Sequence, residues 1–248
     1  MSGHSKWSTI KRKKGANDAK RGKLFTKIIR ELTVSARNGG DESTNPQLRT
    51  ALQNAKSANM PQATIERAIR RGTGDEPGAV YEEGMYEGYG PGGVAVMVET
   101  LTDNKNRTVS EVRHVFSKCN GNLAEKGSVA WMFEQKGLVE VEKNGIDEDE
   151  LMLAVMDAGA EDIQDLEDVF EVITSVVGFE GVKQALDENG IAFAQASLAW
   201  TPQNMLEVQG KEVEQIIRLL ESLEDLDDVQ KVFSNFDVQE EELQSLMT

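Results

Sequence analysis

The hydrophobic period of this chain changes at a glycine-rich segment, and that change limits the possible folds more than any other feature. Before the segment, apolar residues recur at helical spacing near residues 24–36, from residue 45 onward, and near 59–71. The segment itself, residues 72–93, is dense in glycine and proline and predicts a linker with turns. After it, short strand-like runs alternate with short amphipathic runs. This order predicts an α+β protein, in which an N-terminal three-helix domain with a basic arm precedes two small α/β sandwich domains.

Three domains follow from this pattern, and one of them interrupts another. Residues 1–75 are predicted to form the basic arm and the helical domain. Residues 80–137 and 203–240 are predicted to form one α/β domain, and residues 138–202 a second α/β domain inserted in it. The insertion is predicted because the strands and helices of the inserted stretch form a closed set of their own.

Local patterns in the α/β part carry specific expectations. Thr108 and Glu111 have the spacing of a capping box, which predicts that a helix begins there. Apolar runs at residues 129–134 and 138–141 flank Gly137 and predict a hairpin.

Positive and negative charges are separated along the chain. Residues 1–74 hold 16 Lys+Arg and 5 Asp+Glu, a net charge of +11, whereas residues 75–248 hold 11 and 38, a net charge of −27. Cations collected in one module indicate a nucleic-acid partner. Residues 1–23 contain few apolar side chains, so this arm is not expected to fold without a partner.

The predicted nucleic-acid contacts are the cations of the arm and of the first helix, together with a tryptophan suited to stacking on an unpaired base. They are Lys6, Trp7, Lys11, Arg12, Lys13, Lys14, Lys20, Arg21, Lys23, Lys27 and Arg30. Two simpler interpretations stay open: the arm is a solvated tail, and the helical cations are the polar face opposite an apolar stripe.

Residues that suit catalysis are scarce. His4, His114 and Cys119 are the only histidines and cysteine, and Cys119 follows an apolar stripe, which predicts a core position. One group of carboxylates suggests a metal-dependent nuclease: Asp147, Glu148, Asp149, Glu150, Glu161 and Asp162. Such runs more often lie in the first turn of a helix, where they suit the helix dipole. The sequence therefore predicts no enzyme, no cofactor and no metal.

Two further features exclude classes of protein. The glycines of residues 86–93 lack the Gly-x-x-x-x-Gly-Lys-Ser/Thr pattern and precede a predicted strand, so they predict a turn and not a phosphate loop. No apolar run approaches the roughly 20 residues that span a bilayer, and the N-terminus has no apolar stretch typical of a secretory signal. These features predict a cytoplasmic protein without a membrane partner.

Several segments together resemble the YebC/PmpR family, over the whole chain and in the same order. They are Gly3-His4-Ser5-Lys6-Trp7, Lys23-Leu24-Phe25-Thr26-Lys27, Asn59-Met60-Pro61, residues 65–69, 86–93 and 101–108, and Gly127-Ser128-Val129. The resemblance implies a helical N-terminal domain and two α/β domains, one inserted in the other. It also implies a regulator: bacterial members are described as DNA-binding transcriptional regulators, and mitochondrial relatives as translational activators of cytochrome c oxidase. Some bacterial members are linked to ribosomes, and the family has no established catalytic residues.

Charge and resemblance leave two binding functions open. The first hypothesis is a non-enzymatic, DNA-binding regulator of transcription. The second is a ribosome-associated translation factor that binds ribosomal RNA through the basic arm. Both partners carry phosphates, so charge alone does not separate them. The nuclease is the third hypothesis, and it predicts cleavage that depends on magnesium or manganese.

Overall fold

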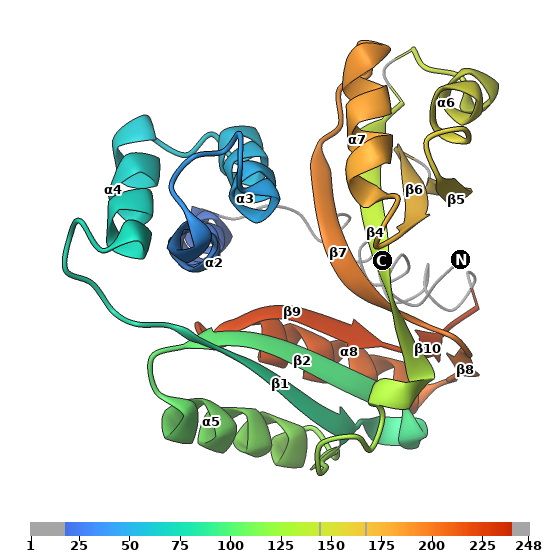
Figure 1. The fold of residues 1–248 in the computed structure, drawn as a ribbon. Coiled ribbons are helices and arrows are strands. Elements are labelled where there is room, and N and C mark those ends of the chain that lie inside the picture. Colours follow the sequence, from blue (N-terminus) through green and yellow to red (C-terminus); the bar gives the residue numbers. More distant parts are fainter. Residues whose placement is uncertain (1–17, 144, 167, 240–248) are drawn as a thin grey trace. The chain divides into compact units, whose positions relative to one another are not determined.

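A computed structural model describes residues 18–143, 145–166 and 168–239 (Figure 1). The chain divides into two compact units, which are described separately. One unit holds Leu32–Glu76 and Gln135–Trp200. The other holds Pro77–Glu134 together with the described residues of Ser2–Glu31 and Thr201–Thr248.

The helical part follows the predicted order. Its elements are helix α2 (Asp18–Ser35), a 3₁₀ turn (Ala36–Asn38), α3 (Pro46–Ser57) and α4 (Gln62–Thr73). Asn45 caps α3 by accepting a hydrogen bond from the Leu48 amide at 3.1 Å, which satisfies one of the amides left open at a helix start. Helix α4 approaches the last turns of α2 closely at Gly72, where a Cβ atom would lie 2.4 Å from the Thr33 carbonyl oxygen. Only glycine permits that approach.

The α/β body is a sheet with helices on one face. Its strand order is β3-β1-β2-β9, and the strands are β1 (Glu82–Tyr89), β2 (Ala95–Thr102), β3 (Asn122–Leu123) and β9 (Val229–Ser234). Helices α5 (Lys105–Lys118) and α8 (Lys211–Glu224) cover one face (Figure 1), and β8 (Leu206–Glu207) pairs in parallel with β10 (Phe236–Asp237). Strand β1 runs antiparallel to β2, with Tyr86 opposite Val98.

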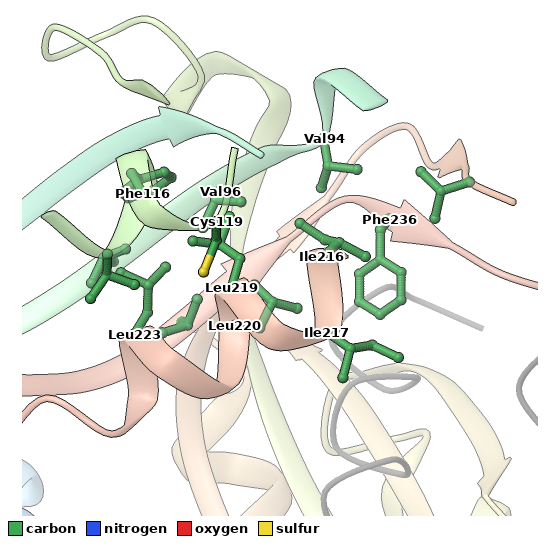
Figure 2. Close-up of a cluster of buried hydrophobic side chains, with 14 of the residues drawn as sticks. Val94, Val96, Phe116, Cys119, Ile216, Ile217, Leu219, Leu220, Leu223 and Phe236 are labelled. Atoms are coloured by element: carbon green, nitrogen blue, oxygen red, sulfur yellow. The ribbon is translucent and has the colours of Figure 1, made fainter. Parts of the chain in front are cut away.

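The core of the body lies between this sheet and its two helices. Figure 2 shows the labelled members, which include Val96 from β2, Phe116 from α5 and Leu220 from α8. Cys119 is 6% exposed in the same cluster, which confirms its predicted core position. The helical spacing of Val213, Ile216, Leu220 and Leu223 places one face of α8 on the sheet.

The inserted part has its own sheet and core. Its strand order is β5-β6-β4-β7, and the strands are β4 (Phe133–Glu142), β5 (Ala160–Leu166), β6 (Val169–Ser175) and β7 (Gln195–Pro202). Helices α6 (Glu148–Val155) and α7 (Phe179–Glu188) bury Leu151, Val155, Val182 and Leu186 against Val139, Val141 and Val172 of the sheet. The predicted α+β class is confirmed.

The glycine-rich segment is not only a linker, and this part of the prediction is wrong. Strand β1 occupies residues 82–89, and two of its glycines are there for space and not for a turn. A Cβ atom on Gly88 would lie 2.7 Å from the ring of Phe116, and one on Gly84 would lie 2.7 Å from the Thr100 hydroxyl oxygen. Gly92 and Gly93, which follow β1, do have the positive φ angles of a turn.

Two local predictions also differ from the structure. Helix α5 begins at Lys105 and not at Thr108, because the Asn104 side chain accepts a hydrogen bond from the Arg107 amide at 3.1 Å and caps the helix earlier. The predicted hairpin around Gly137 is one continuous strand, β4, preceded by a 3₁₀ turn at Ala130–Met132. Within that strand, position 137 requires glycine, because a Cβ atom there would lie 2.4 Å from the ring of Phe179.

Candidate nucleic-acid interface

The predicted contact residues fall into three groups in the structure. Six of them lie outside the described residues: Lys6, Trp7, Lys11, Arg12, Lys13 and Lys14. The backbone of Lys20 and Arg21 belongs to α2, but their side chains are likewise outside the described part. Lys23, Lys27 and Arg30 are described, and all three belong to α2. The assignment of the arm to nucleic acid therefore stays a prediction.

Lys23, Lys27 and Arg30 form one stripe of α2, as their spacing along a helix requires. The stripe meets the segment at the end of α8. Lys23 Nζ donates to the Asp225 carboxylate at 2.8 Å, and Lys27 Nζ donates to the Glu224 carbonyl oxygen at 3.0 Å. Cations at the C-terminus of a helix satisfy its last carbonyls and suit its dipole. The Lys23 pair is exposed, with 43% and 68% of the two side chains accessible.

Asp228 is the buried centre of a charge network. Its side chain is 2% exposed, and it accepts from Arg30 at 2.8 Å, from Arg107 at 2.7 Å, from Thr108 at 2.7 Å and from Thr102 at 3.0 Å. Burial alone would favour the neutral acid, but these hydrogen bonds outweigh it and hold the pKa of Asp228 below its ordinary value. The network therefore keeps an ionised carboxylate inside the protein.

Arg30 acts as an anchor of α2 in this network. Its side chain is 11% exposed, and it also donates to the carbonyl oxygens of Leu101 at 2.9 Å and Asp227 at 2.6 Å. Its guanidinium lies 5.3 Å from the ring centroid of Tyr81. These contacts hold the guanidinium inside the protein through its Nη1 atom. Sequence reasoning missed this role because Asp228 follows Arg30 by 198 residues.

A second buried carboxylate holds a loop of the body. Glu87 of β1 is 3% exposed and accepts from the amides of Gly127 at 2.7 Å, Val129 at 2.8 Å and Ala130 at 2.9 Å. Burial opposes ionisation, but the three amides outweigh it and lower the pKa of Glu87. One carboxylate thus satisfies three backbone donors that no strand pairs.

The same loop presents an exposed tryptophan. Trp131 is 66% exposed, yet its Nε1 donates to the Ser128 carbonyl oxygen at 3.1 Å, which fixes the ring. Tyr89 donates its hydroxyl to the same oxygen at 3.0 Å. An indole held in this way on a rigid loop offers an open aromatic face. Sequence reasoning did not select Trp131, although its position after Gly127-Ser128-Val129 was the available signal.

The carboxylates of the nuclease hypothesis include a helix cap, residues of a first helical turn and a member of an ion pair. Asp147 caps α6 by accepting from the Asp149 amide at 3.1 Å, and Glu148 and Glu150 are exposed in its first turn. Glu161 forms an ion pair with Lys136 at 2.9 Å. Within the described residues, no group of three or more His, Cys, Asp or Glu side chains is placed to hold a metal ion. His114 is exposed on α5.

Comparison with known proteins identifies the family of the chain. Residues 5–75 match the model of the TACO1/YebC protein N-terminal domain, and residues 81–236 match the model of the TACO1/YebC second and third domain. The chain belongs to the TACO1/YebC family. A probable transcriptional regulatory protein of Desulfosudis oleivorans is 59% identical over 95% of this chain and 96% of its own length. Another, of Desulfotalea psychrophila, is 58% identical over 99% of both chains.

One solved structure supports both the family and the fold. The crystal structure of a conserved hypothetical protein from Aquifex aeolicus matches with a TM-score of 0.85 and 47% identity, over 90% of this chain and 93% of that one. No helix in the described part of this TACO1/YebC member is long and apolar enough to cross a membrane.

The segments that carry the family resemblance have clear structural tasks. Thr102, Arg107 and Thr108 belong to the segment at 101–108, and all three bind Asp228. The segment at 86–93 supplies Glu87, which binds the Gly127-Ser128-Val129 loop. In this TACO1/YebC chain, the family segments of the body therefore build two buried carboxylate centres.

Proposed function

We propose that the protein is a non-enzymatic regulator of gene expression that binds nucleic acid through its basic N-terminal module, residues 1–74. The observation that carries the proposal is the separation of charge, with net +11 in this module and net −27 in residues 75–248. Phosphates are attracted to the first region and repelled by the second, so binding is oriented. The relatives named as probable transcriptional regulatory proteins support a regulatory role.

A DNA-binding regulator of transcription is the first form of the proposal. The names of the relatives favour it, and lysine and arginine contacts to phosphates supply affinity that does not depend on sequence. The attachment of α2 through Arg30 and Asp228 supports it as well. The cations of the arm directly precede helix α2. Because α2 is attached to the body, the arm begins at a defined position on the protein.

A translation factor that binds ribosomal RNA is the second form. The exposed, fixed indole of Trp131 favours it, because aromatic rings stack on unpaired bases and RNA offers many of these. Duplex DNA keeps its bases stacked and gives such a ring no partner. In both forms the protein acts in the cytoplasm without a cofactor.

A salt titration tests the binding proposal. The test variant replaces Lys11, Arg12, Lys13 and Lys14 with alanine; the control replaces Arg113, Lys118, Lys211 and Arg218, which are exposed cations outside the module. Both variants lose the same charge. Affinity for duplex DNA and for single-stranded RNA is measured against salt concentration. We expect the slope of log K against log salt to fall by about 3 in the test variant alone, since each contact contributes roughly 0.7 to 0.9. Equal slopes in the two variants would overturn the proposal.

Two measurements separate the two forms. The native protein and the four-alanine arm variant are sedimented through gradients of cell lysate, with and without nuclease. The translation form requires that the native protein travels with ribosomes and that the variant does not. In addition, Trp131→Ala is expected to weaken single-stranded RNA binding and to leave duplex DNA binding unchanged. Equal effects on both nucleic acids would count against stacking.

A further inference from the structure

The inserted domain exposes an unusual group of large apolar side chains. Val177 is 93% exposed and Leu153 is 83% exposed. Met152, Met156 and Val176 are 40%, 48% and 43% exposed. These five residues are called the apolar patch below. Single exposed apolar residues are ordinary on a protein surface, but a group of them marks an interaction surface.

Helix α6 and its C-cap Met156 contribute three residues of the patch, because the helix is apolar on more than one side. After its acidic first turn, the sequence from Leu151 to Met156 contains no polar residue. Leu151 and Val155 are fully buried in the core, which uses the inward face of the helix. Met152, Leu153 and Met156 remain on the surface. A helix with apolar residues on both faces is normally covered on both sides, and within the described residues the outer face of α6 is exposed.

The two parts of the patch belong to neighbouring segments. The turn after α6 touches the turn between β6 and α7, because a Cβ atom on Gly178 would lie 2.9 Å from the Gly159 carbonyl oxygen. Helices α6 and α7 also pack beside one another (Figure 1). Met156 therefore lies on one side of this junction, and Val176 and Val177 lie on the other.

The surroundings of the patch are strongly acidic. Residues 135–200 hold 3 lysines and 16 Asp+Glu, a net charge of −13. Each of these lysines is already paired with a carboxylate of the same domain: Lys136 with Glu161, Lys143 with Asp165, and Lys183 with Glu180. Close to the patch, Glu148, Asp149 and Glu150 in the first turn of α6 are exposed, and so is Asp157, directly after Met156.

We propose that the apolar patch of the inserted domain binds a lysine- and arginine-rich amphipathic segment of another protein. The apolar stripe of such a segment covers Leu153 and Val177, and its cations meet the surrounding carboxylates. Charge complementarity of this kind accelerates association and excludes acidic partners. The same carboxylates repel phosphates, so nucleic acid does not fit this surface. The proposal is independent of the function of the N-terminal module.

A direct binding measurement with the full chain tests this proposal. The probe is a synthetic, fluorescently labelled amphipathic helix of lysine and leucine, and a peptide of the same composition without an apolar stripe is its control. The test variant is Leu153→Ser with Val177→Ser. The matched control is Leu24→Ser with Val80→Ser, which removes exposed residues of the same types, 47% and 71% accessible, outside the inserted domain. All four side chains are exposed, so both variants are expected to fold.

We expect the test variant to bind the striped peptide about tenfold more weakly, and the control variant to bind it as the native protein does. A second pair of variants tests the charges. Glu148→Gln with Glu150→Gln is expected to lower the affinity at low salt, whereas Glu212→Gln with Glu214→Gln in the first turn of α8 is not.

Three results would overturn the proposal. The first is equal affinity of all the variants, which means that the peptide binds acidic surface without selection. The second is equal affinity for the striped and the stripeless peptide. The third is self-association of the native protein in sedimentation that Leu153→Ser with Val177→Ser abolishes, because the occupant is then a second copy of this chain.

Discussion

The α/β body and the inserted domain are both rich in carboxylates, and they use them in opposite ways. In the body, Asp228 and Glu87 are 1% and 3% exposed, and each collects several hydrogen bonds. In the inserted domain, most carboxylates lie on the surface, and those that pair with lysines do so at exposed positions such as Glu161. The first arrangement organises the fold, and the second creates a negative field around an apolar patch.

The difference shows that the type of a charged residue does not reveal its task. A buried carboxylate has lost its hydration, so it is stable only where donors replace water. An exposed carboxylate keeps its water, and its ion pairs contribute little to stability. Mutation of the buried centres should therefore act on folding, and mutation of the exposed residues should act on binding.

The largest expected effect is that of Asp228→Ala. Removal of this carboxylate leaves Arg30, which is 11% exposed, without its counter-ion. We expect a loss of about 3 to 5 kcal/mol in the free energy of unfolding, the range found when one partner of a buried pair is removed. Urea denaturation followed by circular dichroism measures it, and amide exchange should show faster opening of α2. The control is Asp225→Ala, at an exposed pair, with a loss below about 1 kcal/mol. Similar losses in both variants would contradict the comparison.

Glu87→Gln should have the next largest effect. The amide side chain keeps one acceptor oxygen and turns an NH₂ group toward amides that also need an acceptor. We expect a loss of about 1.5 to 3 kcal/mol in the free energy of unfolding, together with increased mobility of the loop that carries Trp131. Chemical denaturation and the fluorescence anisotropy of Trp131, in a background where Trp7 and Trp200 are phenylalanine, measure the two effects. Glu83→Gln, at an exposed position of the same strand, should change neither.

A smaller effect should appear in the dependence of stability on pH. The folded-state pKa values of Asp228 and Glu87 lie below the ordinary values of 3.8 and 4.5, so the unfolded chain takes up these protons first. Their stabilisation is present above the ordinary values and is lost as the pH falls below them. Asp228→Asn should therefore flatten the acid side of a plot of unfolding free energy against pH. A slope unchanged by this substitution would show that Asp228 titrates alike in both states.

Two other carboxylates act in the opposite direction in the same titration. Burial raises the pKa of Glu31 and of Glu99, and a neighbouring carboxylate adds to each shift, Glu99 for Glu31 and Glu83 for Glu99, while Lys231 opposes both. Glu99 faces Lys231 across the β2–β9 pair. Their contribution to stability is present below 4.5, the ordinary value, and is lost as the pH rises through the raised values. The variant Glu99→Gln should accordingly be stabilised relative to the native protein at neutral pH, and the gain should disappear as the pH falls below 4.5.

The smallest effect is expected at the surface of the inserted domain. Lys136 and Glu161 form an ion pair at 2.9 Å, with 19% and 41% of their side chains exposed. Removal of this pair by Glu161→Gln should change the free energy of unfolding by less than about 1 kcal/mol, because water solvates both groups. Urea denaturation in parallel with Asp228→Ala provides the comparison. A loss as large as that of Asp228→Ala would show that the two regions do not differ in the way described.

Contacts of the candidate interface were predictable from the sequence only where the partners lie close together along the chain. The shared face of Lys27 and Arg30 could be read from helical spacing, which involves neighbouring residues, whereas Lys23 was predicted to belong to the arm and is part of α2. The occupation of Arg30 by Asp228 could not, because its partner is 198 residues away. In the same way, the spacing of Thr108 and Glu111 suggested a capping box, but Asn104 caps α5 first, because its side chain reaches the Arg107 amide.

The sequence by itself determined the three helices at the start, the α+β class and the separation of charge, since these depend on local periodicity and composition. The tertiary structure alone decided which charges are buried and which glycines make room for a neighbour. Gly88 in β1 accommodates the ring of Phe116. Glu87 beside it accepts hydrogen bonds from three backbone amides of a loop about forty residues further on. Burial and hydrogen bonding depend on contacts between distant segments, and no local pattern records such contacts.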